Sequence, residues 1–177
     1  MHPRLAELLS HADRVRDELL TVADGVDEAR WATPGREGGW SVAQHLAHLH
    51  LVEQSSVRVL FRAFRDARAA GLAQETDTGS LLGALDHTGL AEGRTRIAAP
   101  DFVVPGDAPD RATVRARLAE SRAGLHAWAR EADGHALGEV RFPHPRLGTL
   151  TLYEWVLMIA DHERRHLRQV QALLAAP

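Results

Sequence analysis

The feature that most constrains the fold is an amphipathic stretch near the C-terminus, between Thr151 and Val170. Apolar residues and two histidines, His162 and His166, recur there every three or four residues, which places them on one stripe of a helix. Thr151 with Glu154 predicts a capping box at its start. Residues four apart leave the same helix face, with Cβ atoms about 5–6 Å apart. Buried imidazoles need hydrogen-bond partners or a metal, so the stretch predicts a buried helix carrying half of a metal site.

Three other segments, residues 3–22, 41–70 and 110–133, carry apolar residues at helical spacing. Ser41 begins a second capping box, and Asp110 is a suitable helix N-cap. With the C-terminal stretch, these segments make four amphipathic helices. Metal sites in helical bundles are built from side chains on facing helices.

The segments between these helices are of unequal length. Residues 71–109 lack sustained periodicity and hold many Gly, Pro, Asp and Thr residues. Connections this long are uncommon unless they have a function, so we expect this one to cross the molecule, with a short helix near residues 81–85. Residues 135–150 are expected to be a loop that leads into the last helix. Residues 1–177 are therefore interpreted as a single all-α domain, a four-helix bundle with one long crossover connection.

Composition and charge exclude several classes of protein. The net charge of −3 gives no basic field for nucleic acid. The chain has no cysteine, which excludes disulfides, thiolate ligands and a cysteine nucleophile. No apolar stretch of about 18 residues and no signal-peptide core are found, so we expect no membrane association and a cytoplasmic location.

The run from His162 to His166 also matches H-E-x-x-H, the signature of zinc metalloproteases, in which Glu163 would be the general base. Only residues 167–177 follow, and none of them is His, Glu or Asp. The downstream third ligand of those proteases therefore has no place in this chain. The alternative is that Glu163 pairs locally with arginine residues.

A third histidine ligand can come from the first turns of the second long helix, where His45, His48 and His50 lie. Spacing alone does not decide which of the three faces the core. The pair His162 and His166 has its own alternative, as core histidines hydrogen-bonded to acidic groups or to the backbone. The residues by themselves leave these possibilities open.

Three motifs resemble those of the DinB/YfiT-like superfamily. They are Gly39-Trp40-Ser41-x-x-Gln44-x-Leu46-x-His48-Leu49, Pro145-x-x-Gly148-x-Leu150-Thr151-x-x-Glu154-Trp155 and His162-x-x-x-His166-x-x-Gln169. With the order of the helices and the long middle connection, the resemblance covers nearly the whole chain. The resemblance implies an up-and-down four-helix bundle with an unusual crossover. It also implies a divalent metal held by three histidines, which by position are His48, His162 and His166.

The resemblance implies a function as well, since several relatives use bacillithiol, mycothiol or glutathione in transferase or isomerase reactions. Three imidazoles suit zinc or nickel and leave positions for water or substrate. Without cysteine in the chain, any thiol must come from a cosubstrate. We therefore expect a metal-dependent transferase acting on a small-molecule substrate. The alternatives are a metal-dependent hydrolase, a non-catalytic metal-binding stress-response protein, and a metal-free bundle.

Other expectations concern supporting residues and assembly. Glu53, Asp161 and Gln169 are candidates to orient the ligand rings, by proximity in the sequence. No residue stands out as a general base. The tryptophans and the remaining histidines are expected in packing, surface and loop roles, with His87 in the long connection as a residue that could approach the metal. Apolar helix surfaces and similar proteins suggest a homodimer. The tryptophans expected in packing roles are Trp40, Trp128 and Trp155, and the histidines expected on the surface or in loops are His2, His11, His126, His135 and His144.

Overall fold

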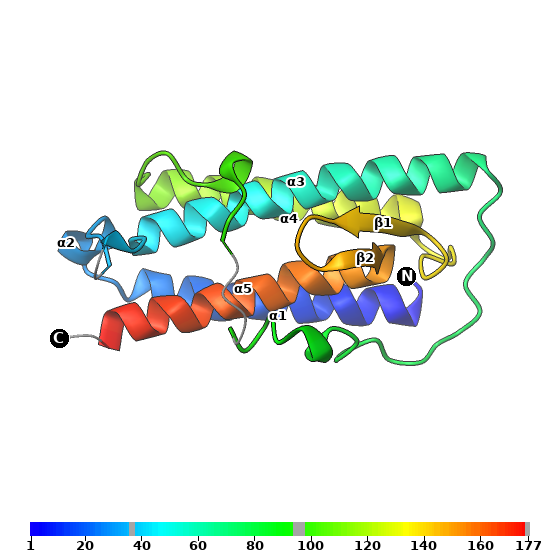
Figure 1. Ribbon diagram of the computed structural model, residues 1–177, viewed down its shortest axis with the longest axis horizontal. Helices are drawn as coiled ribbons and strands as arrows, with labels where there is room; N and C mark the ends of the chain where they lie inside the picture. The colour runs from blue at the N-terminus through cyan, green and yellow to red at the C-terminus, as the bar shows by residue number, and fades with distance from the viewer. Residues whose placement is uncertain (36–37, 94–97, 176–177) are drawn as a thin grey trace.

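Four long helices form a bundle in the computed structural model, which describes residues 1–35, 38–93 and 98–175 (Figure 1). This arrangement confirms the expected all-α four-helix bundle with a long crossover. The described parts of the connections contain 3₁₀ helices and a β-hairpin. The elements are α1 (Pro3–Asp24), α2 (Glu28–Trp31), α3 (Val42–Ala69), η2 (Asp86–Thr88), η3 (Asp101–Val103), α4 (Arg111–Ala132), β1 (Arg141–His144), β2 (Gly148–Thr151) and α5 (Leu152–Ala175).

Three of the long helices, α3, α4 and α5, begin where side chains satisfy free backbone N–H groups. At α3 the Gln44 backbone N–H donates to Ser41 Oγ over 3.3 Å, and the Ser41 N–H donates to Gln44 Oε1 over 3.0 Å. At α5 the Thr151 N–H donates to Glu154 Oε2 over 2.7 Å. At α4 the Asp110 side chain accepts a hydrogen bond from the Thr113 backbone N–H over 2.8 Å. These predicted N-termini are confirmed, and the α3 cap fixes the start of the helix that carries His48.

Replacing Ser41 with alanine is expected to lower the free energy of unfolding by about 1 kcal/mol, because a buried cap is lost and the first turn keeps an unpaired N–H. Urea unfolding followed by circular dichroism measures the change. Ser10→Ala, at an exposed position inside α1, is the matched control and should change stability by less than about 0.5 kcal/mol. Equal effects of the two substitutions would show that the cap contributes nothing particular.

The topology explains why the connection between α3 and α4 is long. In Figure 1, α1 is antiparallel to α3, whereas α3 and α4 run parallel and lie side by side. Gln74 and His135, which follow the C-terminal ends of α3 and α4, accordingly form a β-bridge. A helix of 28 residues is about 42 Å long, and a parallel neighbour requires the chain to return over that length.

Two connecting segments differ from expectation. Residues 82–85 form turns rather than a helix, because Gly83 adopts a left-handed φ of +88°, and η2 follows them. The segment expected as a loop before α5 contains the antiparallel hairpin β1–β2. Its strands have four residues each and Pro143 lies within β1, so alternation in the sequence is too short to reveal them.

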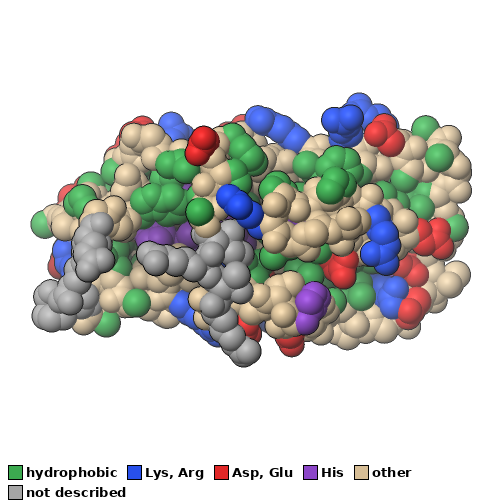
Figure 2. All heavy atoms as spheres, viewed as in Figure 1, with side chains coloured by type: hydrophobic (Ala, Val, Ile, Leu, Met, Phe, Trp, Pro, Cys, Tyr) green, Lys and Arg blue, Asp and Glu red, His purple; other side chains and the backbone are tan. Residues whose placement is uncertain are grey.

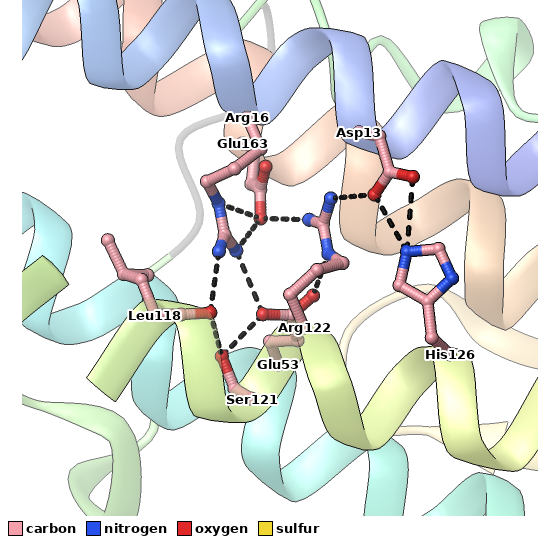
Figure 3. Close-up of polar contacts among 8 residues, drawn as sticks. All are labelled: Asp13, Arg16, Glu53, Leu118, Ser121, Arg122, His126 and Glu163. Carbon is pink, nitrogen blue, oxygen red and sulfur yellow. Dashed lines mark hydrogen bonds and ion pairs between the residues drawn. The ribbon is translucent and has the colours of Figure 1, made fainter. Parts of the chain in front are cut away.

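A charged layer divides the hydrophobic core into two parts. One cluster packs around Trp128 and the other around Leu46. Between them, each long helix contributes one buried charged residue; these are Arg16, Glu53, Arg122 and Glu163. Figure 3 shows the two guanidinium groups lying between the two carboxylates. None of the helices in the described part of the chain combines the length and hydrophobicity needed to span a bilayer.

The layer is held by charge-assisted hydrogen bonds from the two arginines. Arg122 Nε donates to Glu53 Oε1 over 2.7 Å, and its Nη2 donates to Glu163 Oε1 over 2.9 Å. Arg16 Nη2 donates to Glu53 Oε2 over 2.8 Å and also to Glu163. Burial works to raise the pKa of Glu53, but the charges of Arg16 and Arg122 outweigh it and hold the pKa below its usual value. Two arginines and two glutamates thus balance their charges inside the bundle and tie all four helices together.

Candidate metal centre

Three histidines from facing helices converge at one point. His48 comes from α3, and His162 and His166 come from successive turns of α5. One ring nitrogen from each lies within 4.8 Å of the others. His162 Nε2 lies 3.4 Å from His48 Nε2 and 3.1 Å from His166 Nε2. The structure therefore brings together the three residues that the motifs singled out.

Hydrogen bonds orient two of these rings from behind. His48 Nδ1 lies 2.7 Å from the carbonyl oxygen of Val103 in η3. A carbonyl only accepts, so Nδ1 carries the proton and Nε2 of neutral His48 presents a lone pair to the cluster. His166 Nδ1 lies 2.9 Å from His45 Nδ1. When His166 donates its Nδ1 proton to His45, its Nε2 is likewise free to donate a lone pair to a metal.

Burial keeps these rings uncharged at neutral pH. It is the main cause that lowers the pKa of His162 and His166 well below the usual value, and the neighbouring imidazoles lower it further. His48 is 2% exposed, and burial lowers its pKa too. Neutral imidazoles are the form that binds metal ions, so these rings can act as metal ligands at neutral pH.

The three neighbouring histidines of α3 have different roles. His48 joins the α5 pair directly. His45 contacts His166 through Nδ1. Burial is the main cause that lowers the pKa of His45 to about 4, and the nearby His48 lowers it further. His50 is also buried, but it faces Arg117 on α4. His45 is thus a supporting residue that the sequence offered only as a competing ligand.

The residues expected to orient the ligand rings lie elsewhere. Glu53 belongs to the charged layer, where Arg16 and Arg122 bind both of its oxygens. Asp161 faces His11, with 3.9 Å between Asp161 Oδ1 and the His11 ring. These two assignments are wrong because helical rotation turns both side chains away from the cluster. Gln169 lines the adjoining cavity.

Glu163 follows His162 directly and therefore projects about 100° away from it around α5. Its side chain is 1% exposed and its Oε1 accepts hydrogen bonds from Arg16 and Arg122. Glu163 does not line the cavity beside the histidines. Despite the match to H-E-x-x-H, Glu163 is therefore not placed to act as a general base, since it cannot reach a substrate at the cluster.

Replacing His45 with phenylalanine is expected to weaken zinc affinity by about 10–100-fold, because the ring volume stays while the hydrogen-bond partner of His166 is lost. Competition with a chromogenic chelator measures the affinity. His50→Phe is the matched control, because it replaces another buried imidazole of the same helix that does not contact the cluster. If the two variants bind zinc equally well, His45 does not support His166.

The histidines lie at the wall of a cavity of about 800 Å³. Figure 2 shows histidine side chains recessed beside hydrophobic ones on this face of the molecule. The walls come from α3, α5, the hairpin and the crossover, and they are mainly apolar. Their apolar side chains include Trp40, Val52, Val59, Leu90, Phe102, Phe142, Leu147, Trp155 and Met158. A cavity of this size and character is typical of small-molecule sites.

Several cavity residues were not expected there. Trp40 and Trp155 line the cavity, whereas Trp128 is a core residue as expected. Trp40 packs on the cluster, with its ring centre 4.7 Å from that of His48. His144 of β1 also lines the cavity, and His87 lies exposed in η2 away from it. A hairpin invisible in the sequence pattern brings His144 into place.

Comparisons with known proteins agree with this architecture. The sequence model of the DinB superfamily matches residues 11–170. A solved structure described as "TT2238, a four-helix bundle protein" is similar, with a TM-score of 0.66 and 27% sequence identity. The alignment covers 95% of this chain and 98% of that one. No match was found among curated proteins. By its sequence match over most of the chain, the protein belongs to the DinB superfamily.

Proposed function

We propose that the protein is a metal-dependent enzyme in which His48, His162 and His166 hold a divalent metal and a low-molecular-weight thiol is the cosubstrate. The single observation that carries the proposal is the convergence of three uncharged imidazoles at the wall of a large cavity. A protein that uses a metal only for stability has no need of such a cavity. A closed structural zinc would normally have four protein ligands.

The arrangement fits a metal of the zinc or nickel kind. A tetrahedral ion with bonds of about 2.0–2.1 Å holds its nitrogen ligands about 3.3–3.4 Å apart. The separations of 3.4 and 3.1 Å around His162 are close to that value. A metal bound there would serve as a Lewis acid, lowering the pKa of a thiol or a water molecule that enters its open position.

The residues of the chain favour a thiol over water as the nucleophile. Among the described residues that line the cavity, none is an aspartate or a glutamate, and Glu163 is held in the charged layer. In the part of the chain that the structure describes, the cavity thus offers no carboxylate base to remove a proton from water. A thiol with a pKa of about 8.5 needs much less help than water, whose pKa is 15.7.

Cobalt substitution tests the proposal. Bacillithiol, mycothiol and glutathione are added in turn to the cobalt-loaded protein, and the absorption spectrum is recorded. The expected result is a sulfur-to-metal charge-transfer band with one of these thiols, absent in His162→Ala. If no thiol perturbs the spectrum while an ester or amide is hydrolysed without thiol, the enzyme is a hydrolase instead.

A further inference from the structure

His144 brings a polar ring to the cavity from the β-hairpin. It lies at the end of β1, opposite Gly148 in the register of the hairpin, and it lines the cavity together with the three histidines of the cluster. Its ring packs on Trp155 of α5, with 4.9 Å between the ring centres. After burial, which is the main cause, His144 is also one of the groups that lower the pKa of His162. The ring therefore lies near the candidate metal centre, although it is not one of the three expected ligands.

The backbone of the hairpin turn fixes the tautomer of this ring. The N–H groups of Arg146 and Leu147 donate to Nδ1 of His144, over 3.2 and 3.1 Å. A backbone N–H only donates, so Nδ1 is the unprotonated nitrogen and Nε2 carries the proton. Burial lowers the pKa of His144, which keeps the ring in this neutral form at neutral pH. The side chain is thus a hydrogen-bond donor, through Nε2.

The donor at Nε2 is left for a molecule in the cavity. Within the described part of the chain, the hydrogen bonds of this ring are the two that Nδ1 accepts from the turn. Nearby walls are apolar and include Val52 of α3, Met158 of α5 and Phe142 of β1. A ligand that displaces water from such a donor must supply an acceptor of its own, or it loses affinity. The cavity therefore favours a ligand with a hydrocarbon body and an acceptor atom.

Contacts between the hairpin and α5 hold this donor in one place. The Leu152 backbone N–H donates to the carbonyl oxygens of Leu137 and Val140, over 3.2 and 3.0 Å. Trp155 Nε1 donates to the carbonyl oxygen of Phe142 over 3.2 Å, and the two rings also meet edge to face. A donor that is already oriented binds a ligand without a further loss of conformational entropy.

We propose that the substrate is an apolar carbonyl compound, whose oxygen accepts a hydrogen bond from Nε2 of His144 and whose hydrocarbon part lies against the apolar walls. This inference rests on the proposed function in taking the same cavity as the substrate site. It adds the chemical class of the molecule with which the thiol reacts. A neutral N–H suits a neutral oxygen acceptor, and a carbonyl carbon is electrophilic toward a thiolate. When sulfur bonds to that carbon, the electron pair of the C=O π bond moves to the oxygen, where the N–H stabilises it.

Two probes of the same shape test the proposal. 4-Phenyl-2-butanone carries a carbonyl oxygen, whereas (3-methylbut-3-enyl)benzene has a CH₂ group in its place. Calorimetry provides the dissociation constant of each probe with the metal-free and the zinc-loaded protein. Infrared spectroscopy of the ketone, labelled with ¹³C at the carbonyl, reports the contact itself, because a hydrogen bond lowers the C=O stretching frequency.

Two substitutions separate the roles of the two ring nitrogens. Asparagine keeps an acceptor for the turn near the position of Nδ1 but has no donor at that of Nε2, so His144→Asn removes only the proposed contact. Glutamine reaches further, and His144→Gln can place an amide N–H near the position of Nε2. His87→Asn is the control, because His87 also contacts its own turn through Nδ1 and lies exposed outside the cavity. Circular dichroism checks that each variant is folded.

In the wild type, the bound ketone should show a lowered C=O stretching frequency both with and without zinc. His144→Asn should weaken binding of the ketone about 3–10-fold and abolish the frequency shift, while the affinity for the alkene changes by less than about twofold. His144→Gln should recover part of the affinity for the ketone and part of the shift. His87→Asn should behave like the wild type with both probes.

Several results would overturn the proposal. Equal effects of His144→Asn on the two probes would show that the ring contributes shape rather than a hydrogen bond. Failure of the wild type to bind the ketone would exclude an apolar carbonyl compound as the ligand. A frequency shift that requires zinc and survives in His144→Asn would place the carbonyl oxygen on the metal instead. Failure to load zinc would refute the proposed function, whereas the metal-free titrations would still decide the role of His144.

Discussion

Replacing Arg122 with methionine is expected to destabilise the protein by about 3–5 kcal/mol, because the substitution leaves buried carboxylates with too little positive charge. Glu53 and Glu163 are each 1% exposed and would have to share Arg16. Methionine keeps much of the side-chain volume, so the loss is mainly electrostatic. Urea unfolding monitored by circular dichroism measures the free energy directly.

Arg130→Met, at an exposed position of the same helix, is the control and should change stability by less than about 0.5 kcal/mol. A double-mutant cycle sharpens the test. Adding Glu163→Gln to Arg122→Met removes one negative charge and should recover part of the lost stability, with a coupling energy of about 0.5–3 kcal/mol. A loss below 1 kcal/mol for Arg122→Met, or strictly additive effects, would mean that the charged layer does not act as a unit.

Replacing His166 with alanine is expected to abolish the stabilisation that zinc gives to the fold. An ion that binds only the folded state, at a hundredfold excess over its dissociation constant, adds about 2.7 kcal/mol. For a chain of this size that corresponds to about 5–10 °C in melting temperature. Wild type should therefore melt higher with zinc than with a chelator, whereas His166→Ala should melt at one temperature under both conditions.

His87→Ala provides the control for this experiment, since His87 is exposed in η2 and does not line the cavity. It should respond to zinc and chelator as the wild type does. A wild type that loads zinc and yet shows no shift on chelation would contradict the account. So would a zinc shift that survives in His166→Ala.

Local signals in the sequence were sufficient to predict the bundle. Capping boxes at Ser41 and Thr151 mark where two helices begin, and apolar periodicity shows which helix faces are buried. The charged layer could not be predicted in this way. Arg122 and Glu163 resemble the exposed residues of any amphipathic helix, and only the packing of four helices shows that they meet inside the core. Burial of paired charges is a tertiary property without a local signature.

Only part of the candidate site could be predicted, because its remaining contacts also depend on how the helices pack. The spacing of His162 and His166 places both on one face of α5, but the choice of His48 over His45 needed the resemblance to a family. The support that Val103 gives to His48 comes from the crossover, 55 residues away in the chain. The homodimer stays a prediction, which gel filtration with light scattering tests.

Zinc K-edge X-ray absorption of the loaded protein tests the central claim most directly, because it reports the atoms around the metal. The account predicts one zinc per chain with three imidazole nitrogens at about 2.0–2.1 Å and one exchangeable oxygen ligand. His48→Ala, His162→Ala and His166→Ala should each lose this signal, whereas His87→Ala should keep it. Zinc bound through fewer imidazoles, or with the same spectrum in the three alanine variants, would contradict the account.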